Sequence, residues 1–250
     1  ELVTKSADYM EQNKLDSAEY ALNQALISDP KNKNNSWLMT SLSTIQQHLG
    51  KFDAAYISIT SALNKHPESA YMLHQRAGLL LEMDRLDEAR EDYNKLLSID
   101  SLDVEALYHR GVLRLEAKDI AGAEKDFDVA ERHGEFSPYG LMGKALLHRL
   151  NEEWSEVEKI YSAILKDYPE MVELYLKRAE SYLHLDQLSR LSLDLQSAQE
   201  HEFANPTYYF LRGQMRLKQF DKVAARSDFK KAEELGMEHD LLEPWIKKTR

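Results

Sequence analysis

The stretch Leu107-Tyr108-His109-Arg110-Gly111, continued by Ala123, Phe127 and Ala130, contains a spacing that returns along the whole chain. A small residue (Gly111) is followed at fixed offsets by a second small residue, a large apolar residue and a third small residue. The residue about 34 places upstream or downstream of each is usually of the same kind, which indicates an internal repeat of that length.

Four positions of the repeated block keep their character along the chain. Position eight is small: Ser6, Ser43, Ala77, Gly111, Ala145, Ala179 and Gly213. Position twenty is mostly alanine: Ala18, Ala55, Ala89, Ala123, Val157, Leu191 and Ala225. Position twenty-four is large: Leu22, Ile59, Tyr93, Phe127, Tyr161, Leu195 and Phe229. Position twenty-seven is apolar and mostly small: Ala25, Ala62, Leu96, Ala130, Ile164, Ala198 and Ala232. Because helices approach closely only where small side chains face each other, each block predicts two antiparallel helices, which must stack on neighbouring pairs to bury their apolar faces.

This pattern resembles the tetratricopeptide repeat (TPR) family, which has a small residue at position eight, alanine at twenty and twenty-seven, an aromatic residue at twenty-four and proline at thirty-two. Pro30, Pro67 and Pro169 occupy the last of these positions, where proline ends the second helix. The resemblance implies an all-α fold, a right-handed superhelical solenoid of antiparallel helix pairs. We expect seven repeats and a C-terminal capping helix at 240–250, with a docking peptide for another domain as the alternative for that end. The expected repeats are 1–32, 36–69, 70–103, 104–137, 138–171, 172–205 and 206–239.

Position seven, often leucine in the family, is basic in repeats three to seven: Arg76, Arg110, Lys144, Arg178 and Arg212. The long stems of these side chains can pack between repeats while their charges reach solvent. We therefore expect solvated cations at this position.

The composition favours a folded, helical and acidic chain. Hydrophobic residues make up 43% of the 250 residues, and the formal charge is −11. Such a chain lacks the electrostatic footprint of a nucleic-acid-binding protein, and no apolar run is long enough to span a bilayer. A solvated surface is the simpler explanation of the acidity, and preference for a basic partner is the alternative.

The absence of cysteine excludes disulfides, thiolate metal sites and a cysteine nucleophile. The chain begins at Glu1 instead of methionine, which we interpret as the result of processing or trimming. A bacterial exported or periplasmic location is favoured over a cytoplasmic one on this basis.

The family resemblance also implies a concave groove lined by positions two, five, six, nine, twelve and thirteen of each first helix. At these positions the chain is aromatic and weakly polar from repeat two to repeat five. Exposed rings with polar tips offer a peptide a large contact area at a small cost in side-chain entropy. The alternative is that the rings fill gaps between successive first helices. The candidate peptide-binding residues are Trp37, Tyr71, His74, Tyr108, His109, Tyr139, Met142 and Lys177.

No motif for catalysis or cofactor binding is visible, including a P-loop, a Gly-rich dinucleotide turn or a His-Glu-x-x-His helix. The two-carboxylate clamp by which some TPR proteins bind heat-shock chaperones is absent as well, since lysine never stands at position two or five. His74 and His109 with Glu105 lack the close ligand organisation of a zinc site. We therefore expect a non-catalytic scaffold, with no cofactor or metal, that binds a protein or peptide partner. The alternative is a structural assembly subunit that docks through its convex face or its ends, in one form as a homo-oligomer.

Overall fold

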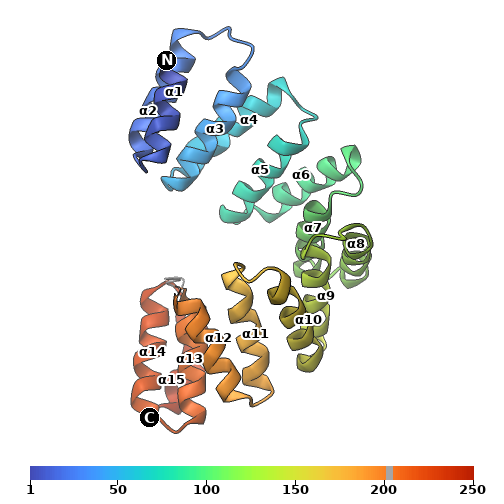
Figure 1. The fold of residues 1–250 in the computed structure, drawn as a ribbon, viewed down its shortest axis with the longest axis vertical. Helices are drawn as coiled ribbons and strands as arrows, with labels where there is room; N and C mark the ends of the chain where they lie inside the picture. The colour runs from blue at the N-terminus through green and yellow to red at the C-terminus, as the bar shows by residue number, and fades with distance from the viewer. Residues whose placement is uncertain (201–204) are drawn as a thin grey trace. The chain divides into compact units, whose positions relative to one another are not determined.

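The structure is a computed structural model that describes residues 1–200 and 205–250. Within these residues the chain forms fifteen α-helices and no β-strand (Figure 1). The prediction of an all-α helical-repeat solenoid is confirmed.

The helices follow one another as antiparallel pairs joined by short turns, so odd-numbered helices up to α13 are first helices and even-numbered ones are second helices. Their bounds are α1 Leu2–Glu11, α2 Leu15–Ser28, α3 Asn35–His48, α4 Phe52–Lys65, α5 Ala70–Glu82, α6 Leu86–Ile99, α7 Val104–Glu116, α8 Ile120–His133, α9 Tyr139–Leu150, α10 Trp154–Asp167, α11 Val172–His184, α12 Leu188–Glu200, α13 Pro206–Lys218, α14 Lys222–Glu234 and α15 His239–Lys248.

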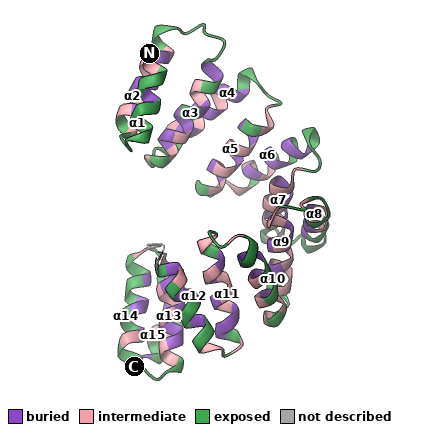
Figure 2. Cartoon of the chain, viewed as in Figure 1, coloured by how far each residue is buried: buried purple, intermediate pink, exposed green. Residues whose placement is uncertain are grey.

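The chain divides into two compact units, residues 1–139 (unit 1) and 140–250 (unit 2). Unit 1 holds α1 to α8, and unit 2 holds α9 beyond its first residue together with α10 to α15. In each unit the buried residues lie along the faces by which neighbouring helices meet, and exposed residues cover the opposite faces (Figure 2). This distribution is the one expected of helix pairs that stack on each other.

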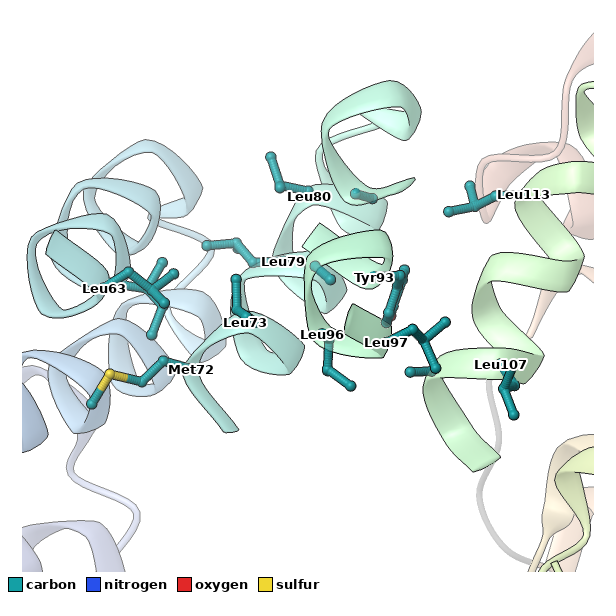
Figure 3. Close-up of a cluster of buried hydrophobic side chains, with 14 of the residues drawn as sticks. Leu63, Met72, Leu73, Leu79, Leu80, Tyr93, Leu96, Leu97, Leu107 and Leu113 are labelled. Atoms are coloured by element: carbon teal, nitrogen blue, oxygen red, sulfur yellow. The ribbon is translucent and has the colours of Figure 1, made fainter. Parts of the chain in front are cut away.

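The small residues at position eight allow the two helices of a pair to meet. Ala77 is fully buried in the same core cluster of unit 1 as Tyr93. Figure 3 shows Tyr93 in this cluster with leucines such as Leu73, Leu79 and Leu96. In the next repeat the approach is closer, because a methyl group on Gly111 would lie 2.3 Å from Cε1 of the buried Phe127 ring. The aromatic residue at position twenty-four therefore fills the space that the small residue leaves.

Each turn from a first helix to its second helix contains one residue with left-handed backbone, two places after the first helix ends. These residues are Asn13, Gly50, Asp84, Lys118, Glu152, Asp186 and Phe220, with φ between 55° and 69°. A left-handed residue directly after the C-cap is a common way to end a helix. Its return in all seven turns shows that the same turn geometry joins each pair, although only Gly50 is a glycine.

The basic residues at position seven differ from the sequence expectation. Arg76 does not send its charge into solvent but binds both carboxylate oxygens of Asp92, at 2.7 and 2.6 Å, and Asp92 is only 4% exposed. The same pairing joins a first helix to its own second helix in three further repeats: Arg110 to Asp126, Arg178 to Asp194 and Arg212 to Asp228. In repeat five the two positions hold Lys144 and Ile160 instead.

Three of these arginines also bond to the preceding repeat. Nη1 of Arg76 donates to Thr60, that of Arg110 to Asn94 and that of Arg178 to Ser162, at distances of 3.4, 3.2 and 3.1 Å. We call the four contacts between arginine and aspartate Arg–Asp pairs. In these three repeats the arginine joins three helices: its own, its partner helix and the second helix of the preceding repeat. Planar guanidinium groups suit such sites because they offer several donors in a fixed geometry.

The last helix, α15, packs on the final repeat. Leu242 is fully buried against Ala225, Phe229 and Ala232 of α14, and Trp245 and Ile246 are partly buried on the same cluster. Nζ of Lys248 lies 3.8 Å from the centre of the Trp245 ring on the outer side. The apolar face of α14 is thereby covered.

Candidate functional site

The first helices of unit 1 present one polar and aromatic face. We define this first-helix face as repeat positions two, five, six, nine, twelve and thirteen of α3, α5 and α7, together with Tyr139. Face positions on neighbouring helices touch: Gln47 Nε2 of α3 donates to Glu82 of α5 at 2.7 Å, and His74 Nε2 of α5 lies 3.2 Å from Glu105 of α7. The side chains named from the sequence on these helices thus form a continuous strip across three first helices.

Trp37 and Tyr71 are the open end of this face. Their side chains are 51% and 56% exposed, and the ring centres are 6.3 Å apart. A shallow hollow beside Trp37 is bordered by Lys65, His66 and Glu68, and the Tyr71 hydroxyl accepts a hydrogen bond from Gln75. Two large rings are therefore available to a partner without any rearrangement.

The other end of the face is a cluster around one carboxylate. His74 and His109 both approach Oε1 of Glu105, at 3.2 and 3.8 Å, and the Tyr139 hydroxyl hydrogen-bonds to the same carboxylate. The ring of Tyr108 lies 5.2 Å from that of His109 and 5.3 Å from that of Tyr139. We call Glu105, His74, Tyr108, His109 and Tyr139 the Glu105 cluster.

The proton affinities in the cluster follow from these contacts. The His109 and His74 imidazoles, followed by the Tyr139 hydroxyl, hold the pKa of Glu105 well below its usual range against the opposing effect of burial. The hydrogen bond to Glu105 raises the pKa of His74 above 6.5. Burial, with the hydrogen bond to Glu105 as the next cause, raises the pKa of Tyr139. Glu105 is therefore an ionised carboxylate throughout the neutral pH range.

In the part of the chain that the structure describes, no group of three or more His, Asp or Glu residues is arranged to hold a metal ion. The chemistry open to these residues is hydrogen bonding, ion pairing and ring contact.

Unit 2 carries a groove on its own first helices, with a volume of about 640 Å³. Lys177 lines it, as do Phe210 and Trp245, while Arg149 and Glu180 are joined across it by two hydrogen bonds of 3.0 and 2.9 Å. The further lining residues are Leu146, Tyr161, Glu173, Leu176, Leu183, His184, Asn205, Thr207, Leu211, Gln214 and Met237.

Met142 is the one candidate that is not available to a partner. Its side chain is only 8% exposed, so it is a buried residue of unit 2. Trp37 and Tyr71 lie together, as do His74, Tyr108, His109 and Tyr139, while Lys177 belongs to the groove of unit 2.

Comparison with known proteins agrees with this architecture. The family model for the tetratricopeptide repeat matches residues 74–138. A tetratricopeptide repeat protein of known structure from Parabacteroides merdae is 34% identical, with a TM-score of 0.80 over 99% of this chain and 97% of the other. The chain belongs to the tetratricopeptide repeat family.

Two further proteins match this chain at lower identity. The crystal structure of the APC/C hetero-tetramer Cut9–Hcn1 has a TM-score of 0.81 at 9% identity, covering 98% of this chain and 48% of that one. A Protein CTR9 homolog of Arabidopsis thaliana is 24% identical over 208 residues, which is 77% of this chain. The chain spans about a fifth (19%) of the length of that curated relative.

TPR proteins are in general protein-interaction scaffolds that bind protein partners, and the family is typically non-catalytic. Along residues 1–200 and 205–250 of this TPR chain, the helices are all too short or too polar to cross a bilayer.

Several groove residues of unit 2 were missed in the sequence. Arg149, Glu180 and His184 stand at positions twelve, nine and thirteen of their TPR repeats, which are positions expected to face the groove. The prediction used only positions two, five and six, where the aromatic residues gather. Applying the same rule to all six positions would have found them.

Proposed function

We propose that the chain is a non-catalytic scaffold that binds a peptide or an extended protein segment on the first-helix faces of its repeats. The observation that carries the proposal is the pair of open rings of Trp37 and Tyr71, each more than half exposed and one repeat apart. Single exposed apolar residues are ordinary, whereas adjacent exposed aromatic rings are typical of a binding surface. The proposed contact residues are Trp37, Tyr71, His74, Tyr108, His109, Tyr139 and Lys177.

The spacing of these rings suits an extended segment. In an extended chain, side chains two residues apart point to the same side and are separated by about 6.6 Å. The Trp37 and Tyr71 ring centres are 6.3 Å apart, and those of Tyr108 and Tyr139 are 5.3 Å apart. Alternate side chains of such a segment therefore match successive rings, while its backbone meets polar groups such as Gln75.

The division into modules belongs to the same proposal. It assigns seven repeats with the bounds given above, each contributing one first helix, and a C-terminal cap at 240–250. The seven left-handed turn residues support the repeats, and the packing of Leu242 on α14 supports the cap.

The experiment is a selection of short random peptides displayed on phage against the full chain, followed by affinity measurements on variants. Trp37→Ala and Tyr71→Ala are expected to weaken the selected peptides by about tenfold or more, because buried aromatic anchors dominate interfaces. Tyr20→Ala is the matched control, since Tyr20 is 67% exposed on the second helix α2. Helicity is followed by circular dichroism. Unchanged affinity in the Trp37→Ala, Tyr71→Ala double variant, or an equal loss in the control, contradicts the assignment.

The second candidate function is assembly through second helices or chain ends, with a homo-oligomer as one form. Tyr20 and Ile27 of α2 and Ile57 of α4 are 67%, 69% and 65% exposed, which makes the second-helix side of unit 1 partly apolar. Light scattering at several protein concentrations tests self-association. A constant monomer mass removes the homo-oligomer form, whereas a mass that rises with concentration and falls in Tyr20→Ala supports it.

A further inference from the structure

The ionised side chains on the first-helix face of unit 1 are acidic. Carboxylates stand there at Glu82, Glu105 and Glu116, and the described positions that define the face hold no lysine or arginine. Arg76 and Arg110 stand at position seven, directly after a face position in the sequence, but their guanidinium groups bind buried aspartates. A segment lying on this face would therefore meet carboxylates with no lysine or arginine among the face positions. The basic groups that contact Glu105 are the His74 and His109 imidazoles.

Glu105 is the carboxylate that is best prepared for a ligand. Its side chain remains 41% exposed while His74, His109 and Tyr139 contact its carboxylate. An ionised carboxylate has about four acceptor sites, so it retains capacity for a further donor. Because its neighbours are fixed by ring contacts, little side-chain entropy is lost when a ligand binds.

The surroundings of Glu105 favour a cation over a neutral donor. The faces of aromatic rings attract ammonium and guanidinium groups. Tyr139, whose hydroxyl contacts the carboxylate, has its ring 5.3 Å from that of Tyr108. A cationic donor adds the attraction of opposite charges to its hydrogen bond with an ionised carboxylate, which a neutral donor does not. The formal charge of −11 on the whole chain draws basic segments toward it and repels nucleic acid and anionic lipid.

We propose that the Glu105 cluster receives a lysine or arginine side chain of the bound segment, so that unit 1 selects basic peptides. The cation pairs with Glu105 and packs against the Tyr108 and Tyr139 rings. This inference rests on the proposed function, because it names the chemistry of the partner at one end of the same face.

The test uses three pools of fluorescent dodecapeptides with uncharged flanks, identical except for a central Arg, Gln or Glu. Binding to the full chain is measured by fluorescence polarisation. The Arg pool is expected to bind about tenfold more tightly than the Gln pool, and the Glu pool most weakly. Glu105→Gln is expected to reduce the Arg-to-Gln ratio to within about twofold. Glu124→Gln, an equal loss of charge at an exposed site on α8, is the control and keeps the ratio.

The outcomes separate this inference from the proposed function. If the Arg and Gln pools bind equally well and Tyr71→Ala abolishes binding of both, the inference about the cation is wrong and the proposed peptide-binding face still stands. A preference for Arg that survives in Glu105→Gln overturns the role of Glu105. No binding of any pool overturns both proposals. The preference measured on the unmodified chain also keeps the test decisive if the Glu105 variant folds poorly.

Discussion

Gly111→Ala is expected to destabilise the protein, although alanine is the commoner residue at this position of the repeat. The added carbon would lie 2.3 Å from Cε1 of Phe127 and 2.8 Å from two further ring atoms, whereas carbon atoms pack best at about 3.5–4.0 Å. The Phe127 ring is fully buried, so it has little room to retreat. Overpacking of a core costs about 1–3 kcal/mol, and alanine regains about 1 kcal/mol in helix propensity. The severe overlap favours the upper part of that range, a net loss of about 1–2 kcal/mol.

The assay is thermal unfolding followed by circular dichroism. For a chain of this size the loss corresponds to a decrease in Tm of about 2–8 °C. The matched control is Gly78→Ala on α5, where a methyl group would meet nothing within 4 Å. This variant makes the same chemical change but is expected to raise the Tm by about 2–4 °C, because only the helix propensity changes. An increase in Tm for both variants would refute the packing argument.

A double variant tests the mechanism of the loss. Gly111→Ala combined with Phe127→Leu copies the pair Ala179 and Leu195, which packs the same position in α11 and α12. Because the smaller side chain removes the overlap, the two changes are expected to couple favourably by about 1 kcal/mol. Strict additivity would indicate that the ring contact is not the cause.

Three further predictions concern charge and packing. In urea unfolding, Asp92→Ala is expected to cost about 2 kcal/mol, because the partly buried Arg76 guanidinium loses its hydrogen bonds to this carboxylate. Asp87→Ala removes the 86% exposed partner of Arg90 on the same helix and is expected to cost less than about 0.5 kcal/mol. The pKa of His74 is raised in the folded state, so the protonated imidazole stabilises the fold. This contribution is fully present below pH 6.5 and is lost as the pH rises through the pKa of the folded state. An NMR titration of His74 should show a midpoint above 6.5, and Glu105→Gln should lower that midpoint. Leu242→Ala is expected to cost about 2–4 kcal/mol and to speed hydrogen exchange in α14, and unchanged exchange there would contradict a capping role for α15.

The fold was predictable from the sequence because packing in this chain is local and repeated. Small residues such as Gly111 and Ala123 and the large Phe127 are neighbours in space at a fixed sequence spacing, so their pattern is visible without knowing the structure. The Arg–Asp pairs have an equally regular spacing of sixteen residues, as from Arg76 to Asp92. They were missed because a charged residue viewed alone predicts solvent exposure, and only its partner position shows otherwise.

The candidate site was less predictable because the same repeat position is not equally open along the chain. At position five, Thr40, Met142 and Leu176 are 2%, 8% and 4% exposed, whereas His74 and Tyr108 are only partly buried. Phe210 at the same position is also only partly buried. The repeat position alone therefore does not decide exposure, which also depends on the side chains of the neighbouring helices.

The additional hydrogen bond of Arg76, Arg110 and Arg178 makes their repeats depend on the repeat that precedes each of them. The aspartate of each pair belongs to the same repeat as the arginine. The additional acceptor, which is Thr60, Asn94 or Ser162, belongs to the second helix of the preceding repeat. A gene duplication or deletion that places such a repeat behind one with an apolar residue at that site removes this hydrogen bond between repeats. Rearrangements of the array are therefore unequal in cost, and those that conserve each neighbour on the N-terminal side keep these bonds.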